Sequence, residues 1–246
     1  IPIVCVPASI DNNLPGSELS IGTDTALNNA VVALDSIKLS AAASHRCFVA
    51  EVMGRKCGYL SLMSGLATGA EKVYLNEEGI TLAGLAADSE RMVESFRSGR
   101  SLYLVIRNER ASVNYTTDVL AHIFAEEGKG LYDVREAILG HQQQGGSPTA
   151  FDRIMATKLV AHSLELLACA LKRGEPTASY VGLMGGKVSD QPLDRMNDDL
   201  DRDHRRPRHQ WWLGLRPAVG LVSQDIGTLT LQDVPDFGEA VDDAAS

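Results

Sequence analysis

Residues 46–66 read RCFVAEVMGRKCGYLSLMSGL and combine a strand, a tight turn and a helix in one continuous stretch. The apolar run at residues 46–53 is typical of a buried strand, and Gly54 and Gly58 bracket a turn. Beyond Gly58, apolar side chains recur at the three- and four-residue spacing of one helix face. A strand that passes through a short turn into a helix is the building unit of a parallel α/β sheet.

The same alternation of strand-like and helix-like segments continues along the chain. It predicts an α/β fold with a mainly parallel sheet flanked by helices. Ser147 and Pro148 are typical of a helix start, and Gly174 of a helix end. The expected strands lie at residues 1–6, 46–53, 72–76, 102–106, 137–139 and 180–183, and the expected helices at 21–39, 59–66, 81–98, 119–124 and 147–173.

The C-terminal part of the sequence departs from this alternation. Residues 194–209 are dense in Asp and Arg and predict a solvated connection, after which Trp211 and Trp212 can anchor the chain on the body. We expect residues 1–216 to form one structural part and residues 217–246, with six acids and no Lys or Arg, an acidic mobile tail. The chain opens on a strand-like run without an initial Met, so we expect a piece of a longer polypeptide.

Composition narrows the possible partners. The 246 residues carry a formal charge of −9, which argues against a nucleic-acid surface but leaves room for a small phosphorylated ligand. No apolar run approaches the roughly 18 residues of a membrane span, so we expect no membrane partner. The four cysteines are scattered without a CxxC pair, which predicts reduced thiols and a cytoplasmic protein.

Polar segments follow four of the expected strands, at residues 7–24, 53–58, 107–112 and 140–148, and all but 107–112 contain glycine. Because parallel strands end at one edge of a sheet, these segments are the expected place for a site. Asp11 could accept a proton from a substrate hydroxyl and Ser9 could hold a phosphate oxygen, although Asp, Asn, Pro and Gly are also ordinary turn residues.

The other segments offer anion-binding groups. Arg55 adds a forked cation beside a helix start, or is a surface arginine in a plain turn. Glu109 could accept hydrogen bonds from sugar hydroxyls or form a surface ion pair, and His141 is either an anion contact or a structural histidine. Arg46 and Arg135 are unremarkable alone. No Walker A pattern and no GxGxxG after a strand occurs, so no nucleotide site is visible.

Taken together, the segments resemble the phosphofructokinase family. The matching stretches occur in family order up to about residue 216, and EEGKG, GHQQQGGSP and QWWLGLRP are most similar to the C-terminal half of the duplicated eukaryotic-type enzymes. They are PASIDNNLPGSELSIGTDTAL, EVMGRKCGYLSLMSGLATGAE, RNERASVNYTTD, EEGKGLYDVREAILGHQQQGGSPTAFDR and QWWLGLRP.

The resemblance implies a 6-phosphofructokinase, which transfers a phosphoryl group from ATP to the 1-hydroxyl of fructose 6-phosphate in glycolysis. Asp11 matches the catalytic base and Arg55 the catalytic arginine. Asn13 and Gln144 depart from the family's Asp and Arg. The positions that match substrate-binding residues are Ser9, Arg46, Met53, Gly54, Glu109, Arg135 and His141, with Arg46 and Arg135 reaching the sugar phosphate of a neighbouring subunit or half.

The resemblance also says what this chain would lack. The family's glycine-rich loop for ATP and Mg²⁺ corresponds to sequence before residue 1, so ATP and Mg²⁺ are expected only in the complete enzyme and no metal ligand is expected here. The isolated chain should therefore be inactive, and function as a homo-oligomer or paired with an N-terminal half. The alternative is a non-catalytic regulatory half that binds a fructose bisphosphate effector. Such halves have usually lost the residues at Asp11 and Arg55, which this chain retains.

Overall fold

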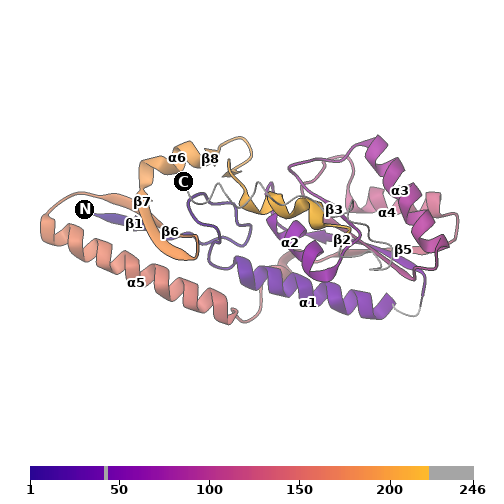
Figure 1. The fold of residues 1–246 in the computed structure, drawn as a ribbon, viewed down its shortest axis with the longest axis horizontal. Helices are drawn as coiled ribbons and strands as arrows, with labels where there is room; N and C mark the ends of the chain where they lie inside the picture. The colour runs from indigo at the N-terminus through magenta and orange to yellow at the C-terminus, as the bar shows by residue number, and fades with distance from the viewer. Residues whose placement is uncertain (42–43, 222–246) are drawn as a thin grey trace.

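The computed structural model describes residues 1–41 and 44–221. Most of the predicted tail at 217–246 therefore lies outside the described residues. Two sheets with their helices occupy opposite ends of an elongated molecule, and α1 (Thr23–Ala41) and α2 (Tyr59–Thr68) lie in and beside the middle (Figure 1).

The larger sheet is entirely parallel, with the strand order β3-β4-β2-β5. Its central strands are almost continuously apolar because helices cover both faces. Side chains alternate along β2: Phe48 and Ala50 pack against α1 and α2, whereas Cys47 and Val49 pack against α3 and α4. The elements are β2 (Arg46–Val52), β3 (Lys72–Tyr74), β4 (Leu102–Asn108), β5 (Asp133–Ile138), α3 (Leu82–Arg97) and α4 (Thr117–Gly128).

The smaller sheet corrects the prediction of a single sheet. In it, β1 (Ile3–Cys5) pairs in parallel with β6 (Ala178–Met184), and β6 pairs antiparallel with β7 (Lys187–Pro192). Strand β7 was not predicted. The two residues that join it to β6, Gly185 and Gly186, both have positive φ, as a two-residue hairpin requires.

Helix α5 (Ala150–Arg173) runs along the smaller sheet. Its start differs from the prediction: Thr149, not Ser147, is the N-cap, and its Oγ1 accepts a hydrogen bond from the Asp152 amide. The predicted end at Gly174 is confirmed by its left-handed conformation. The buried Asp152 carboxylate accepts hydrogen bonds from the amides of Gly22 and Thr25, which ties α5 to the start of α1.

One side of α5 is apolar and exposed, with Ile154, Leu164 and Leu171 more than half accessible. By length and composition α5 is also apolar enough to cross a membrane, which corrects the expectation that no run approaches such a span, and one such helix is weak evidence for a membrane span. On the opposite side of the helix, Met155 and Leu159 pack against β6, so this side is covered by the smaller sheet of the same chain.

The C-terminal segment returns to the body through short elements. Trp212 is buried and packs edge-on against Tyr59 with ring centroids 5.9 Å apart, which confirms the predicted anchor. A hairpin of two short strands lies within the segment predicted to be solvated. The elements are η1 (Gly140–Gln144), η2 (Leu193–Arg195), α6 (Met196–Asp199), β8 (Leu200–Asp201), β9 (Arg206–Pro207) and η3 (Trp211–Ala218).

Candidate active site

The loop after β1 presents Asp11 from a rigid turn. The Asp11 amide donates to Ser9 Oγ at 3.2 Å, and Ser9 Oγ donates to Asn13 Oδ1 at 2.7 Å. Asn12 is buried with φ +52°, and its side chain binds the backbone of Glu18 and Ser20. The loop therefore forms the predicted turn, and within this turn Asp11 is only 7% exposed.

The loop after β2 presents Arg55. Gly54 has φ +140°, and a Cβ at Gly54 would lie 2.4 Å from the Cys57 carbonyl oxygen, so this position requires glycine. Arg55 has φ +49°, in the left-handed region that non-glycine residues seldom adopt. The turn closes through a hydrogen bond from the Cys57 amide to the Gly54 carbonyl.

Two side chains from the neighbouring strand ends hold this turn. Glu109 Oε1 accepts hydrogen bonds from the amides of Gly54 at 3.3 Å and Arg55 at 2.8 Å. Gln143 Oε1 accepts one from the Met53 amide at 2.8 Å. The Glu109 carboxylate lies at the carboxyl edge of the sheet, as predicted. Within the chain it binds backbone amides of the turn, and its predicted contact with a sugar stays a prediction.

Asp11 and Arg55 meet although they follow strands of different sheets. Asp11 Oδ2 lies 3.7 Å from Arg55 Nε, and the Arg55 side chain is 77% exposed. Burial raises the pKa of Asp11, the negative charge of Glu109 raises it further, and Arg55 opposes both. A carboxyl with a raised pKa beside an accessible guanidinium is suited to accept a proton next to an anionic group.

The segment after β5 reaches the same edge. The Leu139 amide donates to the Glu51 carbonyl, and η1 follows with an exposed His141. The sequence analysis missed Gln143, which is 1% exposed and whose Nε2 has no hydrogen-bond partner among the described residues. Its position in a run of three glutamines gave no sign of which one is buried.

Arg46 and Arg135 do not join this cluster within the chain. Arg46 begins β2, and the six residues to Val52 place it about 20 Å from the carboxyl edge. Arg135 lies on the edge strand β5, exposed, with Asp133 as its ion-pair partner at 3.7 Å. Arg135 lies opposite Phe48 in the register of β5 with β2, four residues before Val52, so neither arginine starts from the edge where Arg55 lies.

The side chains of the cluster are suited to an anionic ligand. Within residues 1–41 and 44–221, no three His, Cys, Asp or Glu side chains converge as metal ligands. A carboxylate, a guanidinium and a hydroxyl suit an anionic ligand that also carries a hydroxyl.

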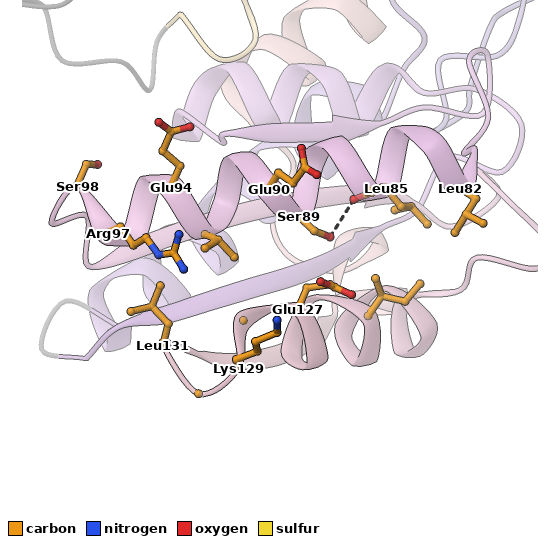
Figure 2. Close-up of a pocket in the computed structure, with 15 residues that line it drawn as sticks. Leu82, Leu85, Ser89, Glu90, Glu94, Arg97, Ser98, Glu127, Lys129 and Leu131 are labelled. Atoms are coloured by element: carbon orange, nitrogen blue, oxygen red, sulfur yellow. Dashed lines mark hydrogen bonds between the residues drawn. The ribbon is translucent and has the colours of Figure 1, made fainter.

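A separate groove of about 1090 Å³ lies between α3 and α4 (Figure 2). Its walls are apolar at Leu85 and Val93, and charged side chains such as Glu90 and Lys129 lie at its rim. None of the predicted site residues lines it. The groove follows the contact between the two helices and contains no residue of the candidate site.

Comparisons with known proteins identify the family of the chain. Residues 1–167 match the family model described as Phosphofructokinase. The chain is 46% identical over 235 residues to ATP-dependent 6-phosphofructokinase of Dictyostelium discoideum, which covers 95% of this chain and 28% of that protein. It is 41% identical over 235 residues to the muscle-type ATP-dependent 6-phosphofructokinase of Homo sapiens, covering 91% of this chain and 30% of that protein.

Among solved structures, phosphofructokinase from Saccharomyces cerevisiae superposes with a TM-score of 0.86 at 35% identity, over 91% of this chain and 31% of that chain. The predicted α/β fold is confirmed by this match. The chain spans less than a third of the length of these relatives.

Proposed function

Since this chain belongs to the phosphofructokinase family, we propose that it supplies the sugar-phosphate site of an ATP-dependent 6-phosphofructokinase. The complete enzyme transfers a phosphoryl group from ATP to the 1-hydroxyl of fructose 6-phosphate, a reaction of glycolysis. The observation that carries the proposal is the buried carboxylate of Asp11 within 3.7 Å of the exposed Arg55 guanidinium.

In this proposal Asp11 is the general base. It takes the proton of the sugar's 1-hydroxyl as that oxygen forms its bond to the transferred phosphorus and the bond to the leaving phosphate oxygen breaks. Because its pKa is raised, the Asp11 carboxylate is a stronger base than an ordinary Asp carboxylate. ATP with Mg²⁺ supplies the phosphoryl group when bound, through residues other than those described here.

Arg55 stabilises the charge that develops on the transferred group. Its side chain is accessible from solvent, and its turn is fixed by Glu109 and Gln143, so the guanidinium is held ready before the ligand binds. The other contacts to the sugar and its phosphate come from the same edge, through Ser9, Met53, Gly54, Glu109 and His141.

Arg46 and Arg135 extend the proposal to a neighbouring subunit or half. Both lie away from Asp11, as expected of cations that complete the sugar-phosphate site of a neighbour. We therefore propose that the enzyme acts as a homo-oligomer or as a pair of halves. The free state of the described cysteines supports a cytoplasmic location, because thiols stay reduced there.

The regulatory reading remains the second candidate because Asn13 and Gln144 depart from the family pattern. In that reading the same cluster binds a fructose bisphosphate effector, which needs cations but no base. The two readings differ in what they require of Asp11, so substitution of this residue separates them.

The experiment is Asp11→Asn in the complete enzyme, with Asp35→Asn on the exposed side of α1 as the matched control. A catalytic site predicts a loss of turnover of about 100- to 10,000-fold with sugar-phosphate binding retained. If turnover persists and only the response to a fructose bisphosphate changes, the site is regulatory and the proposed kinase role is wrong.

A further inference from the structure

A buried polar cluster lies behind the Arg55 turn and connects it to the C-terminal hairpin. Glu77, after β3, and Arg206, on β9, form an ion pair at 3.0 Å, and their side chains are 6% and 12% exposed. Arg206 lies within the segment that the sequence predicted to be solvated, and for this residue that prediction is wrong. Charged side chains are seldom buried to this extent unless they are paired.

The two partners bind the backbone on either side of Cys57. Arg206 Nη1 donates to the Lys56 carbonyl oxygen at 2.6 Å. The Gly58 amide donates to both carboxylate oxygens of Glu77, at 3.0 and 3.1 Å. The ion pair therefore fixes the Lys56–Cys57 and Cys57–Gly58 peptides, which are the second and third peptides after Arg55.

Further contacts attach the hairpin to the same turn. Lys56 Nζ donates to the Asp203 carbonyl at 2.9 Å, and Gln210 Nε2 donates to Glu77 Oε1 at 3.0 Å. The hairpin thus contacts the turn at Lys56, whereas Glu109 and Gln143 bind the amides of residues 53–55.

Arg55 depends on its backbone for its direction. Its side chain is 77% exposed and its carboxylate contact, with Asp11, is at 3.7 Å, so side-chain packing contributes little to its orientation. Its left-handed φ of +49° also needs support from the surrounding structure. A change in the Lys56 peptide would therefore shift the guanidinium.

We propose that the Glu77–Arg206 ion pair is a positioning device that sets the direction of Arg55. Arg206 does not touch the reacting atoms and acts through Arg55 alone. The inference rests on the proposed function of Arg55, and it assigns to the C-terminal hairpin a role in turnover and not in sugar-phosphate binding.

The test is steady-state kinetics of the complete enzyme with the paired substitutions Arg206→Met and Glu77→Gln. Changing both residues leaves no unpaired buried charge, so the variant should fold. We expect kcat to fall by about 10- to 100-fold, the cost typical of a misplaced catalytic group. KM for fructose 6-phosphate should change by less than about 3-fold, because binding contacts are kept. Arg208→Met is the matched control, since Arg208 Nε donates to the Asp198 carbonyl, away from the turn.

The decisive measurement repeats the paired substitution in an Arg55→Ala background. If the pair acts through Arg55, kcat should then change by less than about 2-fold, because the effects are not additive. An equal loss in both backgrounds, or no loss in the wild-type background, would overturn the inference. Failure of the proposed function has a different signature, since Asp11→Asn would then retain turnover whatever the effect of the pair.

Discussion

Glu109 Oε1 lies 2.8 Å from the backbone nitrogen of Arg55. The residue proposed to contact the sugar therefore also holds the turn that presents Arg55, the proposed catalytic cation. In the proposed site Glu109 combines three roles, because its negative charge also raises the pKa of Asp11. Substitution of Glu109 should accordingly alter more than sugar affinity.

Glu109→Gln should change the pH dependence of turnover. The pKa of Asp11 is raised first by burial and then by the negative charge of Glu109, so removal of that charge lowers the pKa. Asp11 must be ionised to accept a proton, and activity is lost as the pH falls through its pKa. The acid limb of kcat/KM should therefore move to lower pH, measured as a rate profile across acidic buffers.

Arg55→Ala is the reciprocal comparison for this profile. Because Arg55 lowers the pKa of Asp11, its removal should move the acid limb to higher pH. Limbs that move in the same direction in both variants, or that do not move, would contradict Asp11 as the titrating base.

Gly54→Ala should disable the site without unfolding the protein. A Cβ at Gly54 would lie 2.4 Å from the Cys57 carbonyl oxygen, so the turn that carries Arg55 must move. We expect kcat to fall by about 100-fold, as for other small misplacements of a catalytic group. Gly79→Ala is the control, because Gly79 also has positive φ but a Cβ there meets nothing within 4 Å. Equal kinetics for the two variants would contradict the steric requirement for glycine at position 54.

Trp212→Ala should destabilise the attachment of the C-terminal segment. Trp212 is 2% exposed and packs on Tyr59, so its removal should cost about 3–5 kcal/mol of unfolding free energy. Trp211→Ala provides the comparison, since Trp211 is 42% exposed and should cost about 1 kcal/mol. Urea unfolding followed by circular dichroism measures both. Similar midpoints for the two variants would contradict the anchoring role of Trp212.

The sequence predicted the parts of the molecule that depend on local periodicity. The strand at residues 46–53 and the helix after Gly58 appear as expected because their apolar spacing matches their burial. The strand β7 was missed because it is polar, and its pairing with β6 depends on the glycine turn between them.

The residues of the candidate site could be predicted from the sequence, but the hydrogen bonds between them could not. Asp11, Arg55 and Glu109 were expected at one sheet edge, and the structure brings them together. The amide contacts of Glu109 and the burial of Gln143 depend on backbone conformations that residue types do not reveal. The docking of Arg206 on Glu77 joins segments distant in sequence, and dense charge suggested solvent instead.

The alternating faces of β2 also limit how this chain can change during evolution. An inserted or deleted residue within β2 would exchange the side chains facing α1 and α2 with those facing α3 and α4. An insertion of two residues would keep the faces but would carry Arg46 about 7 Å further from the turn of Arg55. Length variation among descendants of this sequence should therefore accumulate in the surface connections and spare this strand.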